Sequence, residues 1–187
     1  MSTPSGRHEL GPADGLLRVH TYREGLAQKV GHDLILDVTD WRATVGTGED
    51  GSLVSVTLEA DPRSLRVAGA KGGAKPLSDS DRTAIHDNIA RRVLGADAIT
   101  FRSRTVEGPR EELAVAGELA IAGVTRPASL TVALGPDRRV TGALVIRQSD
   151  WGITPYRAFM GALKVRDTVE IVFDVMLPGS PPPVVGS

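Results

Sequence analysis

The chain has no cysteine among its 187 residues, and it also lacks long apolar runs. The first absence excludes disulfide bonds, thiol nucleophiles and thiolate metal ligands. No stretch approaches the ~20 apolar residues that a membrane-spanning helix needs. The first 14 residues lack the apolar core of a secretory signal. We therefore expect a soluble, cytoplasmic protein with no stable membrane insertion.

An excess of one charge sign is missing as well, because 22 basic and 23 acidic residues leave a net charge of −1. Such a balance gives no broad attraction for nucleic acid, and Arg91-Arg92 and Arg138-Arg139 are too short to form a basic patch. Aromatic residues make up only 4% of the chain. A protein interior built from this sequence would be lined mainly by aliphatic side chains, and no nucleic-acid partner is predicted.

Several catalytic motifs are absent too. The sequence holds no nucleophile elbow and no glycine-rich dinucleotide fingerprint. The segment GAKGGAK at Gly69 to Lys75 lacks the ending of a phosphate-binding loop and does not lead directly into a helix. We therefore interpret it as a flexible loop, and the sequence predicts neither an enzyme nor a cofactor.

What the sequence does contain is a repeated alternation of apolar and polar residues, which is the pattern of half-buried β-strands. In one such stretch Leu113, Val115, Leu119 and Ile121 share a face, and a Gly-Val-Thr-Arg-Pro corner follows it. The predicted strands are Leu16 to Arg23, His32 to Val45, Leu53 to Ala60, Ser64 to Val67, Ala98 to Val106, Glu112 to Ala122, Ala128 to Leu134, Val140 to Arg147 and Leu163 to Leu177.

Two segments of the chain depart from a regular alternation. Within His32 to Val45 the apolar residues change parity, which predicts a bulge near Thr39 and Asp40. The segment Ser78 to Leu94 breaks the alternation, because apolar residues recur there every four positions at Ile85, Ile89 and Val93. This spacing predicts one amphipathic helix.

Local signals mark both ends of this helix. Ser78 is placed to cap its start, with Asp81 three residues on, and Gly95 follows its end. The preceding residues, 67–76, are rich in glycine and end in proline, so we expect a flexible approach. A mobile loop and a helix beside the mouth of a barrel could together act as a lid.

The two ends of the chain differ from its centre in composition. Residues 1–14 are polar and rich in Gly, Pro and Ser, and residues 178–187 contain three consecutive prolines. Both are predicted to be disordered tails. The remaining residues, 15–177, are expected to form one all-β domain, a single antiparallel barrel of eight strands with one amphipathic helix.

Three motifs resemble those of a known family. The segment GELAIAGVTRPASL, residues 117–130, resembles the G-x-L-x-I-x-G-V-T-x-P-x-x-L segment of the YceI-like, polyisoprenoid-binding proteins. Further along the chain, RQSDWGI and VRDTVEI are similar to the family's R-x-D-F-G-I/L and V-x-D-x-V-E-I, and GHDL at Gly31 to Leu34 also agrees. The resemblance implies an extended lipocalin-like barrel whose lumen binds a long isoprenoid, such as a polyprenyl quinone precursor, without catalysing a reaction on it.

Strand parity then predicts which side chains line the lumen and contact this apolar lipid ligand. The lumen residues are Val54, Val56, Leu58, Ile99, Phe101, Leu119, Ile121, Leu130, Val132, Leu144, Ile146, Val169, Ile171 and Phe173. A second set gathers in the connection after residue 147 and is interpreted as a plug or gate with head-group contacts. Its members are Trp151, Tyr156, Phe159, Arg147 and Arg157.

Two other functions remain open at this point. One is a barrel filled by its own side chains that serves as a protein-interaction or stress-related module. The other is a metal-dependent enzyme built on His20, His32 and His86 with Asp33 and Asp87. No H-x-H or H-E-x-x-H spacing supports it, so no metal site is predicted. A homodimer is left open, because the pattern does not reveal which strand edges are exposed.

Overall fold

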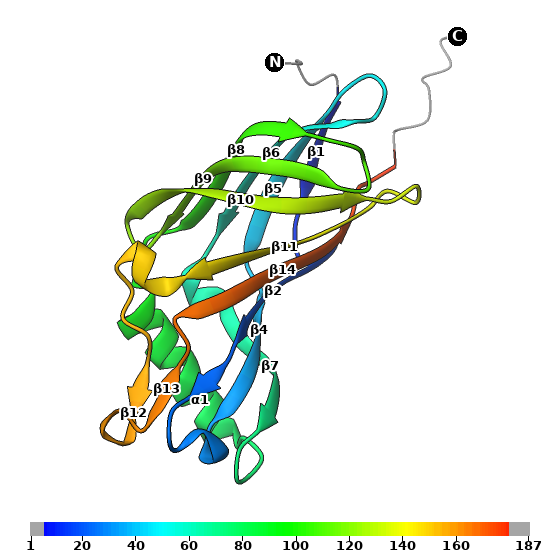
Figure 1. Cartoon of the computed structure of the whole chain (residues 1–187). Coiled ribbons are helices and arrows are strands. Elements are labelled where there is room, and N and C mark those ends of the chain that lie inside the picture. Colours follow the sequence, from blue (N-terminus) through cyan, green and yellow to red (C-terminus); the bar gives the residue numbers. More distant parts are fainter. Residues whose placement is uncertain (1–5, 180–187) are drawn as a thin grey trace.

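Residues 6–179 are described by a computed structural model, and strands dominate them (Figure 1). Eleven strands form one curled antiparallel sheet in the order β1-β5-β6-β8-β9-β10-β11-β14-β2-β4-β7. Their bounds are β1 Gly6–Leu10, β2 Gly15–Thr21, β4 His32–Val38, β5 Trp41–Thr47, β6 Leu53–Ala60, β7 Leu65–Gly72, β8 Ile99–Glu107, β9 Leu113–Ile121, β10 Val124–Leu134, β11 Arg139–Arg147 and β14 Thr168–Met176. The expected all-β class is confirmed.

A second, small sheet lies at one end of the molecule. Its three strands have the order β12-β13-β3, with bounds Arg157–Ala158, Leu163–Val165 and Arg23–Glu24. The described residues contain one α-helix, α1, at Asp79–Asn88, and a π-helical turn, η3, continues it over Ile89–Val93. Short 3₁₀ turns complete the fold: η1 Gln28–Val30, η2 Pro62–Ser64, η4 Gln148–Trp151 and η5 Phe159–Gly161.

The predicted barrel of eight strands is wrong, because the sheet has eleven strands and its two edge strands, β1 and β7, do not pair with each other. The segment predicted as one strand, His32 to Val45, is divided by a bend into β4 and β5, whereas β6 and β7, on either side of a second bend, match the two separate strands predicted at Leu53 to Ala60 and Ser64 to Val67. The irregularity expected near Thr39 and Asp40 is present, but it is a break between two strands and not the predicted bulge, since β4 ends at Val38 and β5 begins at Trp41. The remaining strand is β1, which the sequence did not predict.

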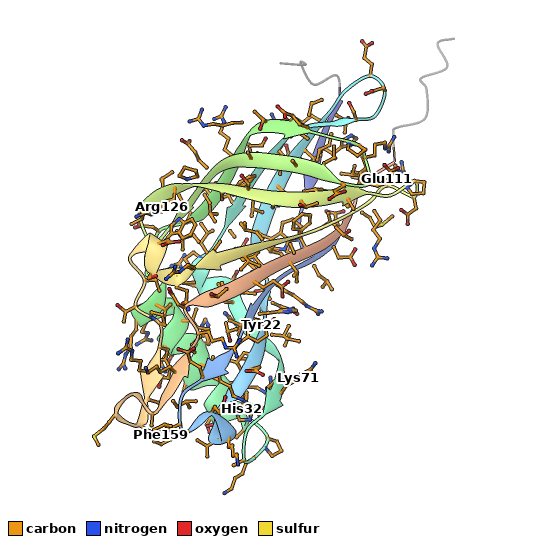
Figure 2. The ribbon with its side chains drawn as sticks, in the orientation of Figure 1. Tyr22, His32, Lys71, Glu111, Arg126 and Phe159 are labelled. Carbon is orange, nitrogen blue, oxygen red and sulfur yellow. The ribbon has the colours of Figure 1, made fainter. Side chains whose placement is uncertain are left out.

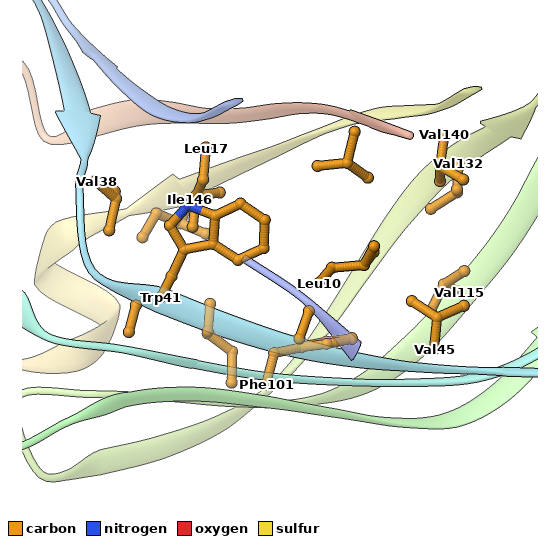
Figure 3. Close-up of a cluster of buried hydrophobic side chains, with 14 of the residues drawn as sticks. Leu10, Leu17, Val38, Trp41, Val45, Phe101, Val115, Val132, Val140 and Ile146 are labelled. Atoms are coloured by element: carbon orange, nitrogen blue, oxygen red, sulfur yellow. The ribbon is translucent and has the colours of Figure 1, made fainter. Parts of the chain in front are cut away.

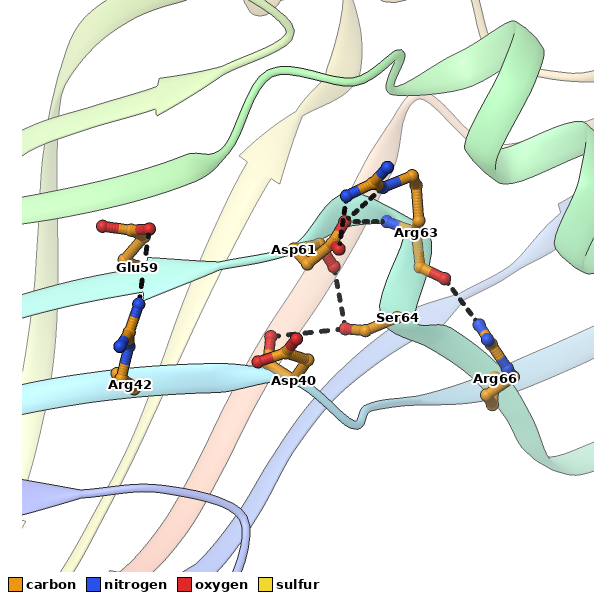
Figure 4. A network of polar contacts seen from close by, with 7 residues as sticks. All are labelled: Asp40, Arg42, Glu59, Asp61, Arg63, Ser64 and Arg66. Carbon is orange, nitrogen blue, oxygen red and sulfur yellow. Dashed lines mark hydrogen bonds and ion pairs between the residues drawn. The ribbon is translucent and has the colours of Figure 1, made fainter.

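The two bends are fastened to each other (Figure 4). The Thr39 backbone N–H and hydroxyl both donate to the Ser64 carbonyl, at 3.2 and 2.8 Å, and the Asp61 N–H donates to the Asp40 carbonyl at 3.0 Å. Ser64 also donates through its hydroxyl to the Asp61 carbonyl at 2.7 Å. Because both bends occur at the same level, β5 and β6 continue to one side of the molecule while β4 and β7 continue to the other.

Two other expectations are corrected. Residues 6–10 were assigned to a disordered tail but form β1, which pairs with β5 and buries Leu10 to 4% exposure. The predicted flexible stretch 67–76 is strand as far as Gly72, because β7 pairs with β4 along its length. Residues 1–5 and 180–187, the outer parts of the predicted tails, lie outside the described residues.

The turn between β9 and β10 also lies earlier than predicted. Ala122 and Gly123 both adopt positive φ, 49° and 77°, which suits a tight two-residue hairpin. Pro127 is therefore inside β10 and not at the corner. Its missing N–H is tolerated there, because β11 pairs only with residues 131–134 of β10 and leaves this part of the strand with one neighbour.

At the β1 end of the sheet, which is uppermost in Figure 1, buried hydrophobic side chains fill the interior, and Figure 3 shows a cluster of them from close by. Trp41 and Phe101 supply the large rings, exposed by 4% and 7%, and Val115 is exposed by only 1%. Aliphatic side chains from β1, β5, β10 and β11 fill the space around them, namely Leu10, Val45, Val132 and Val140. The filled half lies at the β1 end of the sheet.

Candidate ligand-binding cavity

The other half of the interior is hollow. A cavity of about 390 Å³ lies between the helix and the inner faces of β2, β4, β11 and β14. Its walls are mostly aliphatic: Val19, Leu34, Leu36, Val38, Leu65, Ile99, Ile121, Ile146, Ile153, Val169 and Ile171. The volume falls within the ~300 to 1,000 Å³ that is usual for small-molecule sites. One end of the curled sheet is therefore able to enclose an apolar ligand.

The helix forms one wall of this cavity through the predicted apolar face. Ile85, Ile89 and Val93 all border the cavity. The expected cap is present: the Asp81 N–H donates to the Ser78 hydroxyl at 3.2 Å, and the Ser78 N–H donates to the Asp81 carboxylate at 2.9 Å. Because no residue of α1 or η3 is fully buried, the helix covers the cavity without packing deeply into the core.

The small sheet forms the rim on the opposite side. Tyr156, Leu163 and Val165 line the cavity from this part of the chain. The Val165 N–H donates to the Tyr156 carbonyl at 3.0 Å, and the Ala27 N–H donates to the Ala162 carbonyl at 2.9 Å. The loop before β4 and the hairpin of β12 and β13 are thus joined into one rim, which Figure 1 shows at the end of the molecule away from β1.

Hydrogen bonds of polar side chains connect the loops at the mouth, where Figure 2 labels His32 and Lys71. Arg23 donates through Nη1 to the Gly31 carbonyl at 2.5 Å and to the Lys71 carbonyl at 3.1 Å. Its backbone N–H donates to the Asp33 carboxylate at 2.8 Å, and His32 Nε2 lies 2.9 Å from the Lys75 carbonyl. These contacts connect the ends of β3, β4 and β7 around the opening.

Two ionisable groups near the mouth have shifted pKa values. Hydrogen bonds from the Ser78 hydroxyl and backbone N–H lower the pKa of Asp81, so this cavity-lining carboxylate is charged at neutral pH. Burial raises the pKa of Tyr22, and the hydrogen bond that its hydroxyl donates to Glu170 at 3.2 Å raises it further. Asp81 thus places a negative charge on a cavity wall that is otherwise mostly aliphatic, whereas Tyr22 does not line the cavity.

Only part of the predicted lumen set lies on the cavity. Five of those residues border it: Ile99, Ile121, Ile146, Val169 and Ile171. Phe101, Leu119 and Val132 are buried in the core instead, whereas Val56, Leu58, Leu130, Leu144 and Phe173 are half buried against that core. Val54 is half buried outside it. Strand parity identified the inward face but not how far along the sheet the interior is hollow.

The predicted gate residues separate into different environments. Tyr156 lines the cavity, whereas Trp151 is 5% exposed and donates through Nε1 to the Leu119 carbonyl at 3.0 Å. Phe159 is 67% exposed and, like Arg147 and Arg157, does not border the cavity. Of this set, only Tyr156 is placed to touch a ligand inside the cavity.

Sequence reasoning missed a large part of the cavity wall. Leu34, Leu36 and Val38 of β4 line it, and so do the helical residues Ile85, Ile89 and Val93. Both groups were visible as regular apolar patterns in the sequence. The missing information was that β4 and the helix enclose the same space, which depends on the bends that separate β4 from β5.

The histidines proposed for the metal-enzyme alternative are dispersed. His20 Nδ1 lies 3.7 Å from a Glu170 carboxylate oxygen, and His86 Nδ1 lies 2.9 Å from Arg66 Nη1. Within residues 6–179 no group of three or more His, Asp or Glu side chains is arranged to hold a metal ion. Across the same residues, no helix combines the length and apolar character needed to cross a bilayer.

Comparisons with known proteins agree with this architecture. The family model of the YceI-like domain matches residues 28–177. The crystal structure of BcnA from Burkholderia cenocepacia is similar with a TM-score of 0.63 at 15% identity, covering 85% of this chain and 94% of that one. A YCEI protein from Campylobacter jejuni gives 0.53 at 16% identity, covering 81% and 86%. At these identities the structural likeness shows the fold alone, and no curated protein sequence matches the chain.

Proposed function

Since this chain belongs to the YceI-like domain family, we propose that it binds and carries a long apolar lipid of the isoprenoid type, for example a polyprenyl quinone precursor. The observation that carries the proposal is the hollow half of the interior, about 390 Å³ in volume and walled mainly by aliphatic side chains. The ligand is bound there without a chemical reaction on it.

Apolar burial is sufficient to hold such a ligand. Each methylene-sized group removed from water contributes about 0.8 kcal/mol, so roughly three isoprene units contribute ~12 kcal/mol. This gain is comparable with the ~4 to 15 kcal/mol that association costs. A fourth isoprene unit raises the gain to ~16 kcal/mol, which exceeds this cost, so a stable complex is expected.

The distribution of polar groups supports a tail-in orientation. Arg23, His32, Asp81 and Lys164 border the cavity from its mouth, whereas the deeper wall is aliphatic. An isoprenoid tail therefore occupies the interior, while its polar head stays at the rim. Selection is expected to depend on the length and width of the tail more than on head-group chemistry.

Filling the cavity with an indole ring tests the proposal directly. Ile171→Trp places the ring on the cavity wall, and we expect a fluorescent prenyl probe to bind at least tenfold more weakly, equivalent to ~1.4 kcal/mol. Val145→Trp is the matched control, because Val145 lies on the neighbouring strand and is 60% exposed. Probe fluorescence in detergent-free buffer measures both affinities.

The opposite result would contradict binding in the cavity. Unchanged probe affinity in Ile171→Trp would exclude the cavity as the binding site. Native mass spectrometry of the purified wild-type protein, followed by organic extraction, then identifies the natural ligand. A bare protein mass together with no probe binding would favour the alternative function of a protein-interaction module.

A further inference from the structure

Two loops beside the cavity mouth hold large apolar side chains in solvent. Leu26 precedes η1 and is 98% exposed, while Phe159 and Met160 form the tip of the hairpin between β12 and β13, with exposures of 67% and 105%. Val30, at the end of η1, is 47% exposed. We call these four residues the tip surface. We propose that the tip surface docks onto an anionic lipid bilayer, so that the cavity mouth opens toward the membrane.

The two loops form one surface because the backbone joins them. The Ala27 N–H donates to the Ala162 carbonyl at 2.9 Å, and β3 pairs with β13 through Glu24 and Lys164. The Ala162 N–H in turn donates to the Phe159 carbonyl at 3.0 Å. Figure 2 shows Phe159 at the extreme end of the molecule, on the side of His32 and Lys71. The apolar tips therefore project together.

The backbone at the hairpin tip is held in an uncommon conformation. Phe159 and Met160 have φ of 50° and 53°, a left-handed region that bulky side chains rarely adopt. Packing within the chain does not explain it, because both side chains point into water. Strain that presents apolar groups to solvent is typical of a surface that meets an external apolar partner.

Charge around the tip surface matches a bilayer of anionic lipids. Residues 153–166 contain three basic residues, Arg157, Lys164 and Arg166, and no acidic one. Around the same mouth lie Arg23, Lys29, Lys71 and Lys75, set against the acidic residues Glu24, Asp33, Asp79 and Asp81. This end is positive in a chain of net charge −1. Apolar tips surrounded by basic side chains suit a surface that is negative outside and apolar beneath.

The tip surface is also continuous with the proposed cavity. Val30 belongs to it and lines the cavity, and Tyr156 and Leu163 border the cavity on either side of the hairpin tip. A lipid tail leaving a docked membrane would thus pass between apolar side chains without crossing open water. This inference rests on the proposed lipid carriage and adds the place where the lipid is exchanged.

Vesicle co-sedimentation of the full chain tests the inference. Wild-type protein should bind vesicles of phosphatidylcholine mixed with phosphatidylglycerol, and added salt should weaken this binding. The double variant Leu26→Gln with Met160→Asn removes two tips that do not line the cavity, and asparagine tolerates the left-handed backbone. We expect its vesicle affinity to fall at least tenfold.

A matched variant controls for the loss of exposed apolar area. Val145→Gln with Met176→Asn alters residues that are 60% and 44% exposed on β11 and β14, and its vesicle affinity should equal that of the wild type. Equal vesicle binding by the wild type and the tip variant would overturn the inference. It would also be overturned if the wild type were a dimer and the tip variant a monomer. Such a dimer would identify a second copy as the occupant.

Probe binding separates this inference from the proposed function. In vesicle-free buffer the tip variant should bind the prenyl probe as the wild type does, because neither changed residue borders the cavity. Loss of vesicle binding with intact probe binding supports docking. If the wild type binds the probe but does not bind anionic vesicles, the docking inference is wrong and the proposed lipid carriage is unaffected.

Discussion

Asp167 lies between β13 and β14 and fastens the turn that follows β11. Its carboxylate accepts hydrogen bonds from the Ser149 N–H at 2.8 Å and the Ser149 hydroxyl at 2.5 Å, and Arg147 Nε lies 3.4 Å away. The sequence motifs RQSDWGI and VRDTVEI thus meet in space and hold η4 in place. Arg147, expected to contact a ligand head group, is directed to this carboxylate instead.

These contacts predict a pH dependence of folding stability. The Ser149 hydroxyl and N–H, helped by Arg147, hold the pKa of Asp167 below its usual value of 3.8. A carboxylate with a lowered folded pKa contributes stability above the unfolded pKa and loses it as pH falls through the folded pKa. We expect Asp167→Asn to lower the free energy of unfolding by roughly 1 kcal/mol at pH 7, with a smaller difference below about pH 4.

Urea unfolding at several pH values measures this effect. Asp150→Asn is the control, because Asp150 lies in the same turn but is exposed. A difference between wild type and Asp167→Asn that stayed constant down to pH 2 would show that the carboxylate's charge is not what stabilises the turn.

At the scale of elements, the helix has one feature that neighbouring residues determine and one that depends on tertiary packing. The Ser78 cap and its partner Asp81 were predicted correctly, because capping depends on residues only three positions apart. The π-helical turn η3 was not predicted. There the Leu94 N–H donates to the Ile89 carbonyl at 3.0 Å, five residues back. This wider turn lets both Val93 and Leu94 face the cavity, a condition set by tertiary packing.

Removing the cap should loosen the helix without unfolding the sheet. We expect Ser78→Ala to destabilise α1 by ~1 kcal/mol, visible as faster hydrogen exchange of its amides, because the helix has no buried residue to anchor it. Amides of β9 and β10 should exchange as in the wild type. Asp87→Ala, an exposed change in the same helix, is the control, and equal exchange in both variants would refute the role of the cap.

At the scale of the whole molecule, the interior has two halves of opposite character. Trp41 and Phe101 fill one half, and the cavity occupies the other. Both halves are lined by residues that alternate regularly along the same strands, so β9 contributes Val115 to the filled half and Ile121 to the hollow one. The division follows from the bends at Thr39–Asp40 and Asp61–Ser64, which turn β4 and β7 away from β5 and β6.

Equivalent truncations should therefore have unequal costs in the two halves. Val132 and Val169 are both buried in strands, with exposures of 2% and 5%, but only Val169 borders the cavity. We expect Val132→Ala to lower the free energy of unfolding by ~2 kcal/mol and Val169→Ala to lower it by about half as much. The second substitution enlarges a space that already exists, so fewer packing contacts are lost. Urea midpoints of the two variants provide the comparison, and equal losses would contradict a hollow half.

The sequence by itself determined the all-β class, the inward parity of most strands, the change of alternation at Thr39 and Asp40, and the capped start of the helix. Each of these depends on side-chain alternation or on neighbours a few residues apart. Only the tertiary structure decided that β1 joins the sheet, that the interior is filled at one end and hollow at the other, and that Leu26 and Met160 project together. Those features depend on which distant segments meet, and residue periodicity does not specify that.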